Sequence, residues 1–94
     1  MSSKENDSGW WEGADGHRFA LEVLQLPLRR TILKCIDSGV KGNEAIEQAL
    51  GLSSSLAEYH LEMLEKALMI ERTNGGWRVT GTGRLYLDKV EAGR

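Results

Sequence analysis

The side chains most often used for catalysis or metal binding are few in this sequence and lie far apart in it. One cysteine, Cys35, and two histidines, His17 and His60, fall on different predicted elements, so they form neither a nucleophile–base pair nor a metal-ligand set. Gly81 and Gly83 do not form a phosphate-binding loop, because no lysine follows them and no buried parallel strand precedes them. We therefore expect no enzyme, no metal and no cofactor, which leaves binding chemistry.

Hydroxyl and carboxylate side chains gather on one face of a predicted helix over about residues 53–67. At about 100° per residue, one face is apolar and predicts burial; it holds Ala57, His60, Leu61, Leu64, Ala67 and Leu68. The opposite face is polar; it holds Ser55, Glu58, Tyr59, Glu62, Glu65 and Lys66. Ser53, Ser54 and Ser55 are each able to cap the first free amides, so the helix is predicted to begin near Ser53.

A short helix over residues 43–50 precedes it, with Ile46, Ala49 and Leu50 on one face and Asn43 placed to cap its start. Gly51 followed by an apolar residue is a common helix stop, because glycine accepts the left-handed conformation after the last turn. The two helices are then only a few residues apart. This spacing predicts a helix-turn-helix.

Two short strand-forming runs follow, at residues 69–73 and 77–80. They flank Asn74, Gly75 and Gly76, residue types that accept positive φ, so a β-hairpin is predicted over about residues 69–80. Arg72 and Arg78 flank the turn, where a basic wing tip would reach a phosphate backbone.

Three segments of the chain resemble the ArsR-like winged helix-turn-helix regulators. Residues 26–33 (LPLRRTIL) are similar to that family's second-helix pattern, and residues 52–61 (LSSSLAEYHL) with 67–70 (ALMI) to its recognition-helix pattern. Residues 79–84 (VTGTGR) resemble its strand-to-helix ending. The resemblance spans roughly residues 17–91. It implies an α+β, mainly α fold of about five helices with a two-stranded hairpin wing, and a transcriptional regulator that binds double-stranded DNA.

The chain departs from the family pattern in two places. Glu58 stands where the family often has a small hydroxyl residue, and Tyr59 where a basic or polar residue is common. Metal-sensing members use cysteine pairs or clusters of His, Asp and Glu, whereas Cys35 is predicted within an apolar helix face. Metal sensing is therefore not expected.

The resemblance assigns roles by position. Ser54, Ser55 and Tyr59 would meet the major groove, and Glu58 could accept from a cytosine amino group. The wing would contact the backbone; its candidate residues are Arg72, Asn74, Gly75 and Arg78, with Arg29, Arg30 or Lys41 as possible additions. Other readings are open: Ser55 and Glu58 match a capping box, Glu62 and Lys66 a solvent pair, and both wing arginines could be solvated.

A predicted helix over residues 17–26 is apolar around more of its surface than a lone small domain requires. In ArsR-like proteins the first and last helices pair two protomers, and here the last helix is predicted over about residues 81–91. We expect a homodimer interface formed by Phe19, Val23, Leu24, Leu85, Tyr86 and Val90.

Charge distribution favours a rival interpretation. The whole chain has net charge −2, but residues 1–16 carry −3, which leaves +1 for residues 17–94. Non-specific affinity for DNA should therefore be weak. Glu58, Glu62 and Glu65 form an acidic strip, so the alternative is a winged-helix protein-interaction module that docks a partner on this strip in a larger assembly.

The 94 residues suit one small domain. We predict a flexible acidic tail at residues 1–16, in which Trp10 and Trp11 either dock or stay partly exposed, and a winged helix-turn-helix domain at residues 17–94. A lone cysteine forms no internal disulfide, and no apolar run is long enough to span a bilayer. A cytoplasmic protein without membrane contact is expected.

Overall fold

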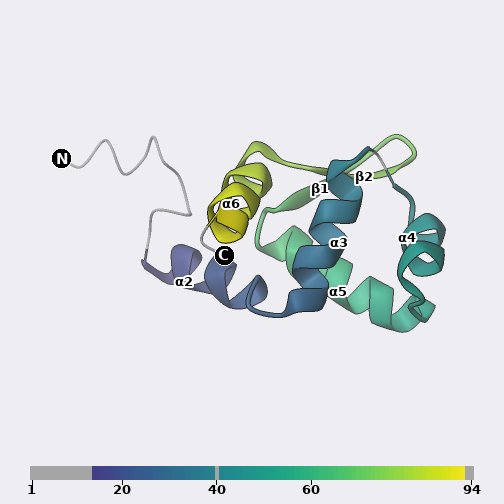
Figure 1. Ribbon diagram of the computed structural model, residues 1–94, viewed down its shortest axis with the longest axis horizontal. Coiled ribbons are helices and arrows are strands. Elements are labelled where there is room, and N and C mark those ends of the chain that lie inside the picture. The colour runs from purple at the N-terminus through teal and green to yellow at the C-terminus, as the bar shows by residue number, and fades with distance from the viewer. Residues whose placement is uncertain (1–13, 40, 93–94) are drawn as a thin grey trace.

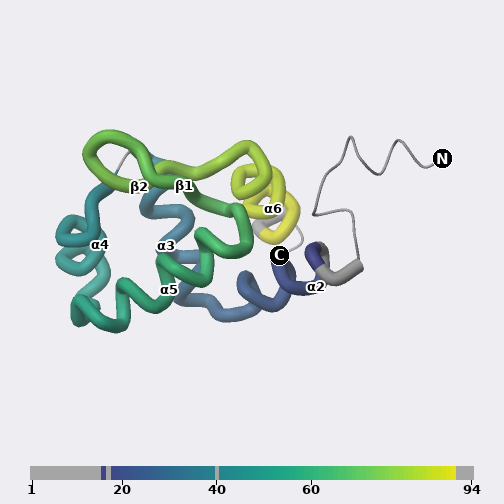
Figure 2. The backbone as a smooth tube through the Cα atoms, turned by 180° about the vertical axis from the view of Figure 1, so that it is seen from behind, coloured from purple at the N-terminus to yellow at the C-terminus, as the bar shows by residue number. Residues whose placement is uncertain are grey.

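The computed structural model describes residues 14–39 and 41–92 and has the predicted winged helix-turn-helix fold (Figure 1). In chain order its elements are α2 (Ala14–Val23), α3 (Pro27–Asp37), α4 (Asn43–Leu50), α5 (Ser54–Lys66), β1 (Ile70–Thr73), β2 (Gly76–Val79) and α6 (Gly81–Ala92). Helices α2 and α6 lie at one end of the molecule, and α4 lies with the hairpin turn at the other (Figures 1 and 2). Trp10 and Trp11 lie outside the described residues.

Helix α3 runs through the middle of the core. Pro27 occupies its first turn, where a missing N–H costs no hydrogen bond. Ile32, Leu33 and Ile36 are buried along one face, against a cluster to which α2, α4, α5, both strands and α6 all contribute side chains. Among the described helices, none combines the length and apolar character needed to cross a bilayer.

The predicted helix over residues 17–26 is wrong at its end. Helix α2 stops at Val23, and Leu26 is 45% exposed with extended backbone angles. A proline disfavours helical geometry in the residue before it, which accounts for the early stop at this position. The side chain of Arg30 donates to the carbonyl oxygens of Leu24 (2.6 Å) and Gln25 (3.2 Å), so it caps the chain that leaves α2. At the other end α2 begins at Ala14, inside the segment predicted as tail.

The helix-turn-helix forms as expected, with the predicted Gly51 stop and one of the predicted serine caps, but without the Asn43 cap. Gly51 has the predicted left-handed conformation, φ 68°. Asn43 does not cap α4, because Gly42 precedes the first turn and the Asn43 side chain accepts a hydrogen bond from Trp77 instead. Ser53 caps α5 through an Oγ bond from the Leu56 N–H (3.2 Å). The alternative capping box of Ser55 and Glu58 is therefore wrong.

Leu68 is also wrongly predicted, since it is 44% exposed instead of belonging to the buried face of α5. The helix ends at Lys66, and Leu68 adopts a left-handed φ of 62°. The N–H groups of Leu68 and Met69 then bond back to the carbonyls of Glu65 and Leu64, which is the Schellman helix stop with leucine where glycine is usual. This conformation turns the Leu68 side chain away from the core.

The hairpin turn is one residue shorter than predicted, because Gly76 already belongs to β2. The strands are antiparallel with Thr73 opposite Gly76, so only Asn74 and Gly75 form the loop. Lys41 pairs with Trp77 through two backbone hydrogen bonds (2.8 and 3.2 Å) and so extends the sheet by one residue. A Cβ atom at Gly76 would overlap with the Lys41 carbonyl, which explains the glycine.

Thr80 joins the hairpin to α6. Its Oγ1 accepts from the Gly83 N–H (2.9 Å) and donates to the Leu68 carbonyl oxygen (2.7 Å), so one hydroxyl caps α6 and ties it to the entry of β1. At Gly83 the helix backbone approaches Met69 so closely that a Cβ atom would overlap with the Met69 carbonyl oxygen. The predicted strand-to-helix motif thus has a steric basis.

We predict that Gly83→Ala lowers the free energy of unfolding by more than about 2 kcal/mol, because backbone must shift to admit the methyl group. Gly81→Ala is the matched control in the same turn, since nothing lies within 4 Å of a Cβ there, and it should change stability little. Urea unfolding followed by circular dichroism measures both. Equal stability of the two variants would contradict the steric explanation.

Candidate nucleic-acid interface

The two faces of α5 divide as predicted. Ala57, His60, Leu61 and Leu64 are buried, whereas the polar face is exposed; it presents Ser54, Ser55, Glu58, Tyr59, Glu62, Glu65 and Lys66. Tyr59 is 53% exposed despite its large ring. This surface can donate and accept hydrogen bonds through three hydroxyls near the helix start, but three carboxylates accompany them.

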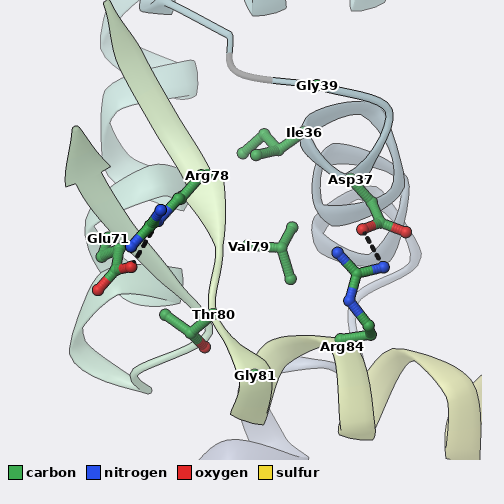
Figure 3. Close-up of a pocket in the computed structure, with 9 residues that line it drawn as sticks. All are labelled: Ile36, Asp37, Gly39, Glu71, Arg78, Val79, Thr80, Gly81 and Arg84. Atoms are coloured by element: carbon green, nitrogen blue, oxygen red, sulfur yellow. Dashed lines mark hydrogen bonds and ion pairs between the residues drawn. The ribbon is translucent and has the colours of Figure 1, made fainter. Parts of the chain in front are cut away.

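The two wing arginines lie on opposite faces of the hairpin. Arg78 is opposite Glu71 in the register, and its Nε lies 2.6 Å from Glu71 Oε2 in an exposed ion pair (Figure 3). Arg72 is opposite Trp77, and its guanidinium lies 4.2 Å from the indole centroid, within cation–π range. Successive side chains of a strand point to opposite faces, so the two-residue turn places the two arginines on opposite faces. The predicted three-residue turn would have placed both on the same face.

Trp77 anchors the wing to the helix-turn-helix. Its side chain is 2% exposed, and Nε1 donates to Asn43 Oδ1 at 2.8 Å. The exposed turn residues Asn74 and Gly75 are therefore carried on a hairpin that is bonded to the first residue of α4. The sequence offers no sign of this bond.

The other predicted phosphate contacts are engaged elsewhere. Arg29 is 5% exposed, and its Nε donates to His60 Nδ1 at 3.0 Å, so it does not reach solvent as a backbone contact would require. Arg30 caps the chain after α2, as described above. Lys41 Nζ bonds to Ser38 Oγ (3.0 Å) and the Gly39 carbonyl (3.4 Å). Arg72 remains as the exposed wing base without a carboxylate partner in the described part of the chain.

His60 is a core histidine, as predicted, at 7% exposure. Burial and the neighbouring Arg29 charge lower the pKa of its imidazole below the ordinary value of 6.5. Its ring centroid lies 5.1 Å from that of Tyr59, with the planes tilted by 57°. Three side chains from α3 and α5 thus meet beneath the exposed face of α5.

An open groove of about 510 Å³ lies behind the hairpin, between the end of α3 and the start of α6 (Figure 3). Ile36 and Val79 form its apolar part, and the pairs Glu71–Arg78 and Asp37–Arg84 stand on opposite sides. Arg84 Nη1 lies 2.8 Å from the buried Asp37 Oδ1, as an ion pair without hydrogen-bond alignment. No sequence pattern brings these residues together. Within residues 14–39 and 41–92, no three His, Cys, Asp or Glu side chains are grouped to hold a metal.

The six predicted dimer residues divide into two groups. Val23, Leu24 and Tyr86 are buried within one chain, and burial raises the pKa of the Tyr86 phenol. Phe19 and Val90 are partly buried against the core, and Leu85 is 39% exposed. Leu21 on α2, which is not among the predicted residues, is 41% exposed. Among these residues, the second group and Leu21 offer surface to another molecule.

Of the comparisons with known proteins, the one with solved structures supports the fold. No family model matches this sequence, and no curated protein sequence matches it either. A similar solved structure is the NMR structure of the homodimeric winged helix-turn-helix DNA-binding domain of a possible ArsR-family transcriptional regulator from Mycobacterium bovis. The TM-score is 0.76 at 23% sequence identity, over 83% of this chain and 77% of that chain. The predicted winged helix-turn-helix fold is thereby confirmed.

The lowered pKa of His60 predicts a pH-dependent stability. As pH falls through 6.5, a histidine in the unfolded chain binds a proton while folded His60 resists it, so the free energy of unfolding decreases. It should be level above about pH 7 and fall by at most about 1.4 kcal/mol per pH unit for this one group. Urea unfolding between pH 5.5 and 8 measures it. His60→Gln should remove this component, and an equal slope in both proteins would contradict the assignment.

Proposed function

We propose that this chain is a DNA-binding transcriptional regulator that inserts the first half of α5 into the major groove and lays the hairpin wing on the phosphate backbone. The observation that carries the proposal is the exposed, hydroxyl-bearing start of α5, together with a wing that Trp77 bonds to the first residue of α4, within a winged helix-turn-helix fold. The described DNA-binding role of the Mycobacterium bovis domain supports it.

The roles of the side chains follow from their exposure. Ser54, Ser55 and Tyr59 donate hydrogen bonds to phosphates or base edges, and Glu58 accepts from a cytosine amino group. Arg72 provides the main positive charge of the wing, with the exposed turn of Asn74 and Gly75 alongside. Arg78 contributes less than Arg72, because Glu71 already neutralises it.

The acidic strip limits affinity without abolishing it. Glu58, Glu62 and Glu65 oppose the phosphates, and residues 17–94 carry a net charge of only +1. Binding to an arbitrary duplex is then weak and declines steeply with salt. Preference for a particular sequence comes from the few hydroxyl and carboxylate contacts of α5.

Amide NMR titration with a short mixed-sequence duplex tests the interface directly. At low salt we expect shifts concentrated at Ser54, Ser55, Tyr59 and the turn of Asn74 and Gly75, which fade at physiological salt, with a Kd of roughly 10⁻⁴ to 10⁻⁶ M. Absence of shifts at low salt would contradict DNA binding and direct attention to protein partners of the acidic strip.

The position of the carboxylates gives a second, sharper expectation. Glu58→Gln should tighten low-salt binding to this duplex about two- to fivefold, because one charge facing the phosphates is removed. Glu22→Gln on α2 is the matched control, since it changes net charge equally from an exposed position on another helix. Equal effects of the two variants would argue against contact through α5.

We further propose that the chain acts as a homodimer through α2 and α6. The two helices lie at the same end of the molecule, where Leu21 and Leu85 are exposed, and the similar domain from Mycobacterium bovis is homodimeric. Phe19 and Val90 lie at the edge of the core on the same helices. A two-fold dimer would read two half-sites about one turn of DNA apart.

Light scattering should give twice the chain mass of 10.5 kDa at micromolar concentration. Leu85→Gln should shift the protein toward monomer, because it places an amide in the apolar interface. Leu56→Gln on α5, where the leucine is 42% exposed, is the matched control and should leave the dimer intact. A wild-type monomer at high micromolar concentration would refute the proposal.

A further inference from the structure

Two polar side chains are buried in the described part of the chain, and they contact each other. Arg29 on α3 and His60 on α5 are 5% and 7% exposed, and Arg29 Nε donates to His60 Nδ1 at 3.0 Å. No carboxylate of the described residues lies within ion-pair distance of Arg29. A buried guanidinium is thus bonded to an imidazole, where a carboxylate would be the usual partner.

This bond requires one particular form of the histidine. The guanidinium stays protonated in proteins, so it can only donate, and Nδ1 must present a lone pair. His60 is therefore neutral, with its hydrogen on Nε2. A proton added at Nδ1 would remove the acceptor and place two positive charges about 3 Å apart, since Nε and Nδ1 are 3.0 Å apart now.

The same guanidinium also contacts the exposed face of α5. Arg29 Cζ lies 5.4 Å from the centroid of the Tyr59 ring, within the range of a cation–π contact. The Tyr59 and His60 rings are 5.1 Å apart. Arg29 therefore touches one side chain that belongs to the core and a second that is 53% exposed.

We propose that Arg29 is a positioning residue for Tyr59 and that neutral His60 holds Arg29 in the orientation that does this. The inference rests on the proposed function for its effect on DNA, because Tyr59 is the large side chain at the start of the groove-facing surface. Protonation of His60 releases Arg29 and lets the Tyr59 ring move. Burial and the charge of Arg29 lower the pKa of His60. Helix α4 and strand β1 also pack on α5, but no charged residue of either contributes to this lowering.

A double-mutant cycle on duplex affinity tests the coupling. Arg29→Lys and Tyr59→Leu should each weaken duplex binding about two- to tenfold. The double variant should bind the duplex no more weakly than the single variant with the lower affinity. Tyr59→Phe keeps the ring and should stay coupled to Arg29→Lys. Arg30→Lys is the matched control, because Arg30 contacts backbone carbonyls rather than Tyr59, so its effect should add to that of Tyr59→Leu. Additive effects of Arg29→Lys and Tyr59→Leu would overturn the proposal.

A second readout needs no DNA, and it does not depend on whether the Arg29→Lys variant folds. In NMR spectra of the wild-type protein between pH 8 and 5, the Tyr59 ring resonances should shift together with the His60 Cε1 resonance. In His60→Gln, which offers an amide oxygen to Arg29 but does not titrate, the Tyr59 resonances should stay constant. Unlinked titrations would overturn the proposal even if DNA binds. If no duplex binds, the proposed function fails, and the ring titration still tests the link between His60 and Tyr59.

Discussion

The position of the wing depends on how Trp77 is buried. A hairpin with two four-residue strands would be only marginally stable alone in water. Here the indole lies in the core, its Nε1 bonds to Asn43, and the Trp77 backbone pairs with Lys41. These bonds run to Lys41, between α3 and α4, and to Asn43, the first residue of α4. They hold the turn at the α4 end of the molecule.

Several basic residues of this near-neutral chain bond to groups of the chain itself, so they are less free to bind a partner. Arg29 is buried, Arg30 and Lys41 bond to backbone or hydroxyl groups, and Arg78 and Arg84 face carboxylates. Exposed ion pairs contribute only about 0–1 kcal/mol each, so they orient side chains more than they stabilise the fold. The exposed face of α5 and the wing therefore present hydroxyl groups and one wing arginine that has no carboxylate partner among the described residues. This surface favours contacts with particular bases over strong non-specific attraction to DNA.

Helix α5 connects the core to this surface. Its buried side packs against α3, and its exposed side presents the polar candidates. The Arg29 guanidinium makes that connection specific, because it contacts both His60 and Tyr59. The hydrogen bond between buried Arg29 and neutral His60 depends on pH, because a proton on the imidazole removes the acceptor. An apolar pair in the same place would not depend on pH.

The periodicity of apolar residues was enough to predict which side of α5 is buried, and Gly51 was enough to predict where α4 stops. Both are local properties, because helix geometry and the steric freedom of glycine act over a few residues. The hairpin followed from its turn residues, although counting Gly76 in the turn hid the fact that Arg72 and Arg78 lie on opposite faces.

The partners of the polar side chains were decided by the tertiary structure alone. Asn43 was expected to cap a helix and instead binds Trp77, and Arg29 was expected at a phosphate and instead binds His60. Leu68 left the buried face because the Schellman stop rotates it outward. A hydrogen bond between residues about thirty positions apart leaves no periodic trace in a sequence, since its strength depends on distance, angle and burial that exist only once the elements have packed.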